Sequence, residues 1–415
     1  MAKTTLWTKN YTLLTVATIL GAAGAVAGNF ALSFLVFDET GSPFAAALIF
    51  AIQVIPGFLV PLIAAPWMDR LPRKPFLVLG DAINGAFYIL GGLWLMFFPF
   101  SYLGYLAFSL LLTSLSSFDR LAFNSLYPML IPAGMEQKGY AIAGILYPVL
   151  EVVMMPLAAV LLDTIGVAWI LILQGALSLL AAFTENFIRI KEENRLHEDA
   201  PSLKLWARDI KEAVRYLKGE RGLRSIYSYC AFSGGMMMGY TPVLVAFFRT
   251  AAGMTTAMYS LFTVAEFAGR ALGGVLHYNI NIPPKKRFGF VFSVYNTYDS
   301  MDACLLWLPY PLMLVNRALC GFLATNSATL RQTAVQQYIP EALRARINAF
   351  EGMINLAVSS VLALIVGAIA EMIDYRLCMT LCGAASLAFC WLIIFRNRKD
   401  VSQIYLTQKT AVETE

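Results

Sequence analysis

The stretch GVAWILILQGALSLLAAF, residues 166–183, contains no charged side chain. A helix needs about twenty predominantly apolar residues to cross the hydrocarbon core of a bilayer, and this stretch forms most of such a run. The rest of the chain has the same character, because 59% of its 415 residues are hydrophobic and only 14% are charged. Soluble domains are about half apolar and about a quarter charged. The composition therefore excludes a soluble globular protein and predicts a polytopic membrane protein.

Twelve apolar runs of membrane-spanning length follow one another along the chain, with turn or charge signals between them. The first run begins after Lys3 and Lys9 and continues to Phe37, which is longer than the apolar core of a cleaved signal peptide, so we expect it to be retained. The predicted fold is all-α and integral to the membrane. Its expected transmembrane helices, about twelve in number, are residues 11–36, 43–68, 75–98, 102–130, 138–162, 166–189, 223–248, 253–277, 287–308, 310–335, 345–370 and 376–395.

Lysine and arginine are distributed unevenly between the two ends of these spans. If the N-terminus is cytoplasmic, the segments on its side hold 25 of the 31 basic residues, the opposite loops hold only Arg249 and Arg376, and four lie within spans. Cytoplasmic loops of membrane proteins carry such an excess. We therefore predict a multi-pass protein of the inner (plasma) membrane with both termini in the cytoplasm. Topology, and not nucleic-acid binding, accounts for the formal charge of +5.

One long polar segment, from about residue 190 to 222, divides the chain in two. We predict an N-terminal six-helix bundle at 1–190, a cytoplasmic linker at 191–222, a C-terminal six-helix bundle at 223–400 and a cytoplasmic tail at 401–415. Within the linker, apolar residues recur at helical spacing opposite a basic face, which predicts an amphipathic helix. Such a helix either lies on the cytoplasmic membrane surface or packs against a helix bundle, and the sequence leaves both possibilities open.

The two halves of the chain resemble each other. Ile131-Pro132 is followed by Ala141, and Ile339-Pro340 is followed by Ala349, at a constant offset of 208 residues. Together with the equal number of spans, this offset indicates two six-helix pseudo-repeats. Such a duplication is a common way to build a transporter with a central site between its halves.

The loop between the second and third spans reads Ala65-Pro66-Trp67-Met68-Asp69-Arg70-Leu71-Pro72-Arg73-Lys74. Its Asp-Arg-x-x-Arg-Lys core resembles the signature loop of the major facilitator superfamily, although Ala65 and Pro72 stand where that family normally has glycine. A carboxylate beside arginines at a helix end can hold one conformation and release another. We therefore interpret Asp69, Arg70, Arg73 and Lys74 as a conformational latch; the alternative is plain positive-inside charge.

Two further stretches are similar to one branch of that superfamily, the bacterial drug, macrolide-type and siderophore exporters. These stretches are residues 332–340 (QTAVQQYIP) and Gly28-Asn29 with residues 37–42. The resemblance implies the major facilitator fold and proton-coupled efflux. Many members of the branch have aspartate where this chain has Asn29, and an amide cannot carry a proton. The glycine-proline antiporter motif of the fifth span is also eroded.

Ionisable side chains within the spans are the strongest functional signal that does not depend on resemblance, because each costs at least about 2.5 kcal/mol at the bilayer centre unless it is paired or hydrated. We predict that Glu151, Glu266 and Asp119 carry protons. Glu266 and Arg270 lie one helical turn apart, with the acid nearer the N-terminus, which favours an ion pair. The alternative for every one of these residues is a paired charge that fixes helix register.

By analogy with the superfamily, in which the first, fourth, seventh and tenth spans line the pathway, Arg120 and Arg317 are expected to face the pathway or a partner beside it. Asp299 and Asp302 lie in a span that is peripheral in that fold, so we interpret them as helix-end or interface residues. Arg120 follows Asp119 directly and points about 100° away from it on a helix, so the two do not pair only with each other.

The seventh span is rich in aromatic and methionine residues, which make adaptable walls for apolar ligands. Tyr227, Met237 and Tyr240 are the residues of this span that we expect at the cavity, together with Asn29 of the first span. Ordinary helix packing is the alternative explanation. The sequence Tyr240-Thr241-Pro242 also predicts a break or kink in the helix.

These features favour a secondary active transporter, specifically a proton-coupled exporter of an amphipathic or hydrophobic small molecule that works by alternating access as a monomer in the lipid bilayer. Uptake or facilitated diffusion of a polar solute is the alternative. An intramembrane enzyme is a distant third reading, because the sequence holds only two histidines and one isolated Asp-x-x-Asp motif. We expect no cofactor and no metal, and the sequence holds no nucleotide-binding P-loop.

Overall fold

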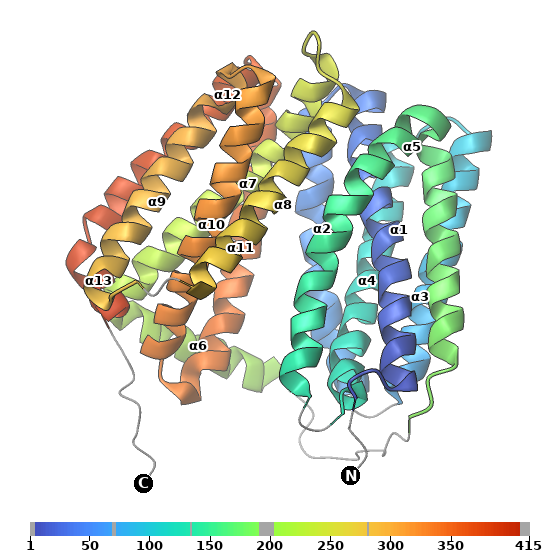
Figure 1. Ribbon diagram of the computed structural model, residues 1–415, viewed down its shortest axis with the longest axis horizontal. Coiled ribbons are helices and arrows are strands. Elements are labelled where there is room, and N and C mark those ends of the chain that lie inside the picture. The colour runs from blue at the N-terminus through green and yellow to red at the C-terminus, as the bar shows by residue number, and fades with distance from the viewer. Residues whose placement is uncertain (1–4, 69–71, 133–134, 191–202, 280–281, 407–415) are drawn as a thin grey trace. The chain divides into compact units, whose positions relative to one another are not determined.

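The computed structural model describes residues 5–68, 72–132, 135–190, 203–279 and 282–406, and within these ranges every regular element is a helix (Figure 1). The elements are α1 (Lys9–Thr40), α2 (Pro43–Met68), α3 (Arg73–Phe97), α4 (Tyr102–Leu130), α5 (Glu136–Asn186), α6 (Leu203–Gly219), α7 (Arg221–Thr250), α8 (Thr256–Asn279), α9 (Pro284–Cys304), η1 (Leu305–Trp307), α10 (Tyr310–Tyr338), α11 (Glu341–Ala370), α12 (Tyr375–Phe389), η2 (Cys390–Phe395) and α13 (Arg398–Leu406). The predicted all-α membrane fold is confirmed.

The long element α5 carries two of the expected spans. Its backbone leaves the helical conformation at Gly166, where φ is 77° and ψ is 174°. A positive φ is readily adopted only by glycine, so the helix turns at the break expected between 138–162 and 166–189. With α5 counted as two helices, α1–α5 and α7–α12 supply the twelve expected spans. Seven of the described helices satisfy the length and composition needed to cross a membrane when each continuous helix is counted once.

The Ile-Pro pairs that suggested a duplication end equivalent helices. Ile131 caps α4 and Ile339 caps α10, each with an extended backbone, and the following proline stands outside the helix. A residue before proline avoids the helical conformation, which explains why both helices stop there. The break predicted at Pro242 is absent, because α7 continues from Arg221 to Thr250; the kink given with it stays a prediction.

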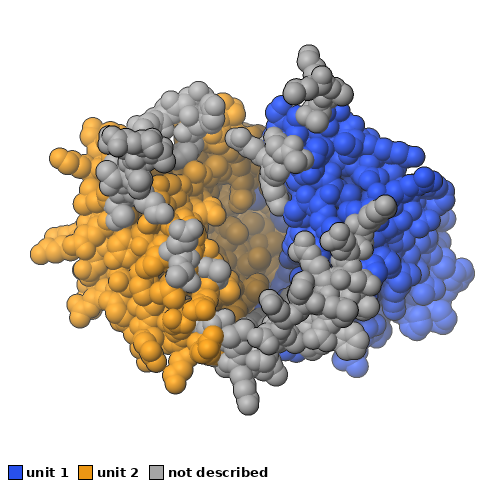
Figure 2. Space-filling view, turned by 90° about the horizontal axis from the view of Figure 1, so that it is seen from below, with its two compact units in different colours: residues 1–200, 252–264 blue, residues 201–251, 265–415 orange. Residues whose placement is uncertain are grey.

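Contacts divide the chain into two compact units, coloured separately in Figure 2. Unit 1 comprises residues 1–200 and 252–264, and unit 2 comprises residues 201–251 and 265–415. The turn after α7 and the first part of α8 therefore group with the N-terminal helices, where Tyr259 packs edge-on against Phe34 with ring centroids 5.4 Å apart. The division into two bundles, a linker and a tail that the sequence predicts stays a prediction.

In unit 1, α1 and α3 pack along α5, and α2 packs against α4. Glycines of α1 lie directly against Gln174 of α5. A Cβ at Gly28 would lie 1.5 Å from Oε1 of Gln174, and a Cβ at Gly24 would lie 3.2 Å from Cα of the same residue. Small residues at helix interfaces let backbones come together in this way. The Gly28-Asn29 pair therefore combines a packing residue with a neighbour that is exposed.

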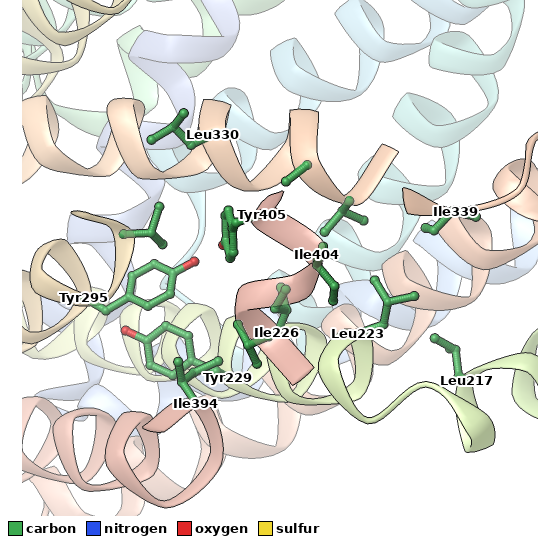
Figure 3. Close-up of a cluster of buried hydrophobic side chains, with 14 of the residues drawn as sticks. Leu217, Leu223, Ile226, Tyr229, Tyr295, Leu330, Ile339, Ile394, Ile404 and Tyr405 are labelled. Atoms are coloured by element: carbon green, nitrogen blue, oxygen red, sulfur yellow. The ribbon is translucent and has the colours of Figure 1, made fainter. Parts of the chain in front are cut away.

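In unit 2, the main buried cluster joins α7, α9, α10, α11, η2 and the two short helices α6 and α13 (Figure 3). On the described part of α6, Ala213 and Leu217 enter this cluster, and Glu212 pairs with Arg346 of α11 at 2.5 Å. The amphipathic helix thus packs against the bundle, the second of the two possibilities left open by its sequence. At the other end, Ile404 and Tyr405 of α13 are almost fully buried, so this part of the expected tail is a docked helix.

Candidate functional site

Unit 1 contains a cavity of about 380 Å³ lined by residues of α1–α4. Asn29 and Arg120 both line it, and both side chains are exposed. Most of the other polar lining residues carry hydroxyl groups: Ser33, Tyr88, Tyr105, Ser109, Thr113 and Ser116. Gln53 adds an amide, which donates to the Ser109 hydroxyl at 2.5 Å. This wall offers hydrogen-bond donors and acceptors beside one guanidinium, which suits a ligand with a polar or negatively charged end.

Unit 2 contains a second cavity, of about 270 Å³, lined by residues of α7, α9, α10 and α11. Met237 lines it and accepts a long contact from the Tyr298 hydroxyl, with 3.9 Å between oxygen and sulfur. Arg331 donates to the Cys230 sulfur at 2.6 Å and lies within electrostatic range of Glu351. The positive charge of Arg331 is therefore partly balanced by Glu351, which lies in the same unit.

The two cavities occupy corresponding positions of the pseudo-repeat. Adding the offset of 208 residues to Asn29 gives Met237, and both line their cavity. The same offset relates Ser116 to Ala324, and Arg120 to residue 328, which is an alanine. Equivalent positions thus carry polar or charged groups in unit 1 and apolar groups in unit 2.

Three acidic side chains from different helices approach one another inside unit 1. Asp119 of α4 lies within electrostatic range of Asp81 of α3, and both lie within range of Glu185 near the end of α5. Glu185 is only 3% exposed. Its Oε2 atom and Oδ1 of Asp119 are buried and have no hydrogen-bond partner among the residues that the structure describes. The α3 backbone adjoins the group, because a Cβ at Gly80 would lie 3.1 Å from Oδ1 of Asp119.

We call these three residues the acid cluster. Only Asp119 was selected from the sequence, although Asp81 and Glu185 also lie within expected spans and satisfy the same criterion. Among the described residues, no group of three or more His, Cys, Asp or Glu side chains is arranged to hold a metal ion. Carboxyl groups that lie close enough to repel one another can bind and release protons.

Glu151 lies on the same side of unit 1 as the acid cluster. Tyr147, one turn earlier on α5, is within electrostatic range of Glu151, Asp119 and Arg120 together. Glu151 itself is half-buried, while Tyr147 is 51% exposed. The predicted proton carrier is thus near the cluster but more accessible than Glu185.

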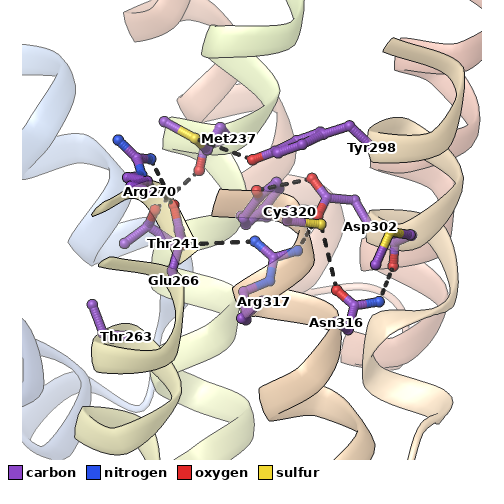
Figure 4. Close-up of polar contacts among 12 residues, drawn as sticks. Met237, Thr241, Thr263, Glu266, Arg270, Tyr298, Asp302, Asn316, Arg317 and Cys320 are labelled. Atoms are coloured by element: carbon purple, nitrogen blue, oxygen red, sulfur yellow. Dashed lines mark hydrogen bonds and ion pairs between the residues drawn. The ribbon is translucent and has the colours of Figure 1, made fainter. Parts of the chain in front are cut away.

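In unit 2, the charged residues selected from the sequence form one connected network (Figure 4). Glu266 accepts from Arg270 at 2.6 Å, which is the i,i+4 pair expected from the sequence. Its other carboxylate oxygen lies 3.8 Å from Arg317 of α10. Arg317 is 1% exposed and also pairs with Asp302 of α9. The network therefore ties α8, α9 and α10 together.

The remaining groups around this network are hydrogen-bonded inside unit 2. Tyr240 is buried and donates to Asp302 at 3.0 Å, so it supports the ion pair and does not line the cavity. Tyr229 donates to Asp299 at 2.9 Å. By contrast, the Tyr227 hydroxyl is buried and has no hydrogen-bond partner among the described residues; it lies within electrostatic range of Arg331. The ion pairs of Glu266 and the hydrogen bond from Tyr240 to Asp302 match the alternative given above, in which a buried charge is paired and fixes helix register.

The latch predicted from the loop is only partly described. Asp69 and Arg70 lie outside the described residues. Arg73 donates to the carbonyl of Ser125 near the end of α4 at 3.2 Å, and Lys74 donates to the carbonyl of Asn186 at the end of α5 at 2.7 Å. Cations at helix C-termini satisfy free carbonyls and favour the helix dipole. These two hydrogen bonds connect the start of α3 to the ends of α4 and α5 within unit 1.

Residues 13–297, more than half of the chain, match the profile of the Major Facilitator Superfamily. The chain belongs to this superfamily. The matched segment includes the 65–74 loop but ends before residues 332–340, so the narrower exporter branch stays a prediction. No protein of curated function matches the chain.

Several solved structures share the facilitator fold with this chain. The nucleoside transporter NupG is 12% identical, with a TM-score of 0.71 and coverage of 94% of this chain and 99% of its own. A bacterial homologue of the iron transporter ferroportin is 16% identical, with the same TM-score and coverage of 96% and 98%. A bacterial homologue of the lysosomal transporter Spinster is 14% identical, with a TM-score of 0.63 and coverage of 95% and 94%. Identities this low show a common fold and leave the substrate of this major facilitator open.

Proposed function

We propose that this protein is a proton-coupled secondary transporter that exports an amphipathic small molecule by alternating access. The observation that carries the proposal is the acid cluster, buried in unit 1 next to an arginine-bearing cavity. The membrane location and a transport role follow from superfamily membership. The plasma membrane and the monomeric state are part of the proposal, as are the cytoplasmic termini, which are supported by the charge distribution of the loops.

Proton exchange at the cluster follows from its electrostatics. Carboxylates that share a site of low dielectric constant repel one another and cannot all stay ionised. The buried carboxyl oxygens of Asp119 and Glu185 that lack hydrogen-bond partners leave room for a proton or a water molecule. We propose that Asp119 is the principal proton carrier, with Glu151 as the accessible acid through which protons enter or leave.

Coupling between proton and substrate follows from adjacency on α4. Asp119 faces the acid cluster, while the next residue, Arg120, lines the cavity. In this scheme the deprotonated cluster attracts a cationic group of the substrate, while Arg120 holds a polar or anionic group at the cavity wall. A proton that neutralises the cluster weakens its hold on the cationic group. Proton and substrate thus compete for the negative charge of the cluster, which is the minimum that exchange requires.

The substrate class is inferred from the two cavity walls taken separately. In unit 1 the wall is polar and contains Asn29, Gln53 and Arg120. In unit 2 the position that corresponds to Asn29 is Met237, with Tyr298 beside it. The unit 1 wall suits the polar end of an amphipathic molecule, and the apolar end rests on the exporter-branch resemblance, because the unit 2 cavity also holds Arg331, Glu351 and Asn355. The export direction rests on the resemblance to the exporter branch.

A polar solute, moved by uptake or facilitated diffusion, is the second possibility. The hydroxyl and amide groups of the unit 1 cavity favour it, because they would satisfy a hydrogen-bonding ligand without help from an apolar wall. In that case the acid cluster is structural and substrate movement does not depend on a pH gradient.

Purified protein in proteoliposomes distinguishes these possibilities. An imposed pH gradient is expected to drive accumulation of lipophilic cations or zwitterions from a test panel by wild type. Asp119→Asn is expected to abolish gradient-driven accumulation while leaving exchange of labelled for unlabelled substrate. Asp163→Asn, which removes an exposed acid on α5, is the matched control and is expected to behave as wild type. Gradient-driven transport that survives Asp119→Asn would show that Asp119 is not the carrier.

A further inference from the structure

A third cavity, of about 550 Å³, lies in unit 2 where α7 begins and α12 ends. Its lining includes three arginines from two separate elements, Arg221 and Arg224 on α7 and Arg396 just after η2. All three side chains are exposed. Among the described residues, no acid lines the cavity and none forms an ion pair with any of the three arginines. A cavity with this concentration of guanidinium groups has an electrostatic preference for an anion.

The walls of this cavity are fixed by hydrogen bonds and close packing. Asn397 donates to the Ser225 hydroxyl at 2.9 Å and to the Ile393 carbonyl at 3.0 Å, and Ser225 donates to the Arg221 carbonyl at 2.9 Å. This chain of bonds joins the first turn of α7 to the segment after η2. On the other side of α7, a Cβ at Gly222 would lie 2.7 Å from the carbonyl oxygen of Asp400 in α13. These contacts therefore hold the backbone that carries the three arginines in place.

A π-helical turn shapes the second wall. The N–H of Arg396 donates to the carbonyl of Trp391, five residues earlier, at 3.2 Å. One residue more per turn rotates the following side chains relative to a regular α-helix, and such turns occur frequently at functional sites. Here the turn brings Arg396 and Asn397 to the cavity, while Leu392 on its rim is 60% exposed. The site thus combines a cationic, hydroxyl-bearing interior with an apolar edge.

We infer that this cavity binds a phosphate group, as carried by the headgroup of an anionic phospholipid. Arginine recognises phosphate through paired, charge-assisted hydrogen bonds, and Ser228 supplies a hydroxyl at the same wall. The cavity lies at the ends of two expected spans, 223–248 and 376–395, which is the level of lipid headgroups. The exposed Leu392 lies where an acyl chain would leave the headgroup. Inorganic phosphate has the same chemistry without the chain.

Native mass spectrometry of the full-length protein with phosphatidylglycerol or phosphatidylcholine tests the inference. Wild type is expected to bind phosphatidylglycerol about tenfold or more tightly than phosphatidylcholine, because several charge-assisted bonds are at stake. The triple variant Arg221→Gln/Arg224→Gln/Arg396→Gln is expected to lose this preference. The matched control removes three exposed cations of α6, with Arg208→Gln/Lys211→Gln/Arg215→Gln, and is expected to keep it.

Two further measurements make the result decisive. Ser228→Trp fills the cavity without changing charge and is expected to weaken phosphatidylglycerol binding even if the triple variant fails to fold. Competition by millimolar inorganic phosphate would show that the cavity takes free phosphate, whereas lipid binding that phosphate does not displace identifies the phospholipid. The inference is overturned if Ser228→Trp and the triple variant keep the lipid preference, or if the α6 control loses it equally.

Discussion

The pair formed by Asp302 and Arg317 provides the sharpest test of how unit 2 is held together. Arg317 is 1% exposed and Asp302 is 5% exposed, so the ion pair is almost fully removed from solvent and lipid. Asp302→Asn keeps the shape and one acceptor oxygen for Tyr240 but removes the charge. Arg317 is then left with Glu266, whose Oε2 atom is 3.8 Å away and whose Oε1 atom accepts from Arg270.

The expected loss of stability is about 3–5 kcal/mol, the range for breaking one side of a buried pair and leaving the other charge uncompensated. Arg270→Gln is the matched control within the same network. Its side chain is 42% exposed, so its loss is expected to cost about 0–1 kcal/mol. The contrast follows from burial, because each variant removes one member of an ion pair and the two pairs differ in exposure.

Unfolding of the purified protein in detergent, followed by intrinsic fluorescence, measures both variants. Asp302→Asn combined with Arg317→Met removes both charges and is expected to recover most of the stability that Asp302→Asn loses. The reasoning fails if Asp302→Asn is no less stable than Arg270→Gln. It also fails if the double variant is less stable than either single variant, since that would mean that the charges do not act on each other.

Three further predictions concern the backbone and the ends of the helices. Gly166→Ala should destabilise the protein by about 1 kcal/mol or more in the same unfolding assay, because φ of 77° is unfavourable for any residue with a Cβ. Gly269→Leu should prevent the protein from folding, because its Cβ would lie 1.9 Å from a backbone oxygen of α10. Gly274→Leu is the control and should be tolerated, because the nearest atom to its Cβ is 4.0 Å away. The size-exclusion profile of each expressed variant measures the outcome. Burial and a hydrogen bond to Glu220 raise the pKa of Tyr338, beyond the expected end of its span, to about 12. The folded state therefore binds this proton more tightly than the unfolded state, so stability should fall between about pH 10 and pH 12, and by less in Tyr338→Phe.

The sequence by itself determined the helices and their limits. Long apolar runs must form helices in a bilayer because each backbone polar group has to be satisfied within its own segment. Gly166 and the two Ile-Pro pairs act on the local backbone, so their effect could be read without knowing any neighbour. The Glu266–Arg270 pair was predictable for the same reason, since both residues lie on one face of one helix.

Only the tertiary structure decided which buried charges meet. Asp302 was expected at a helix end or an interface, but its pairing with Arg317 depends on how α9 and α10 are rotated against each other. The acid cluster draws Asp81, Asp119 and Glu185 from three helices, and no spacing along the chain relates them. Hydropathy indicates that a segment crosses the membrane, but it does not determine how that helix is rotated about its own axis. That rotation is set by packing, above all by glycines that bring particular faces together, and it decides which side chains share a site.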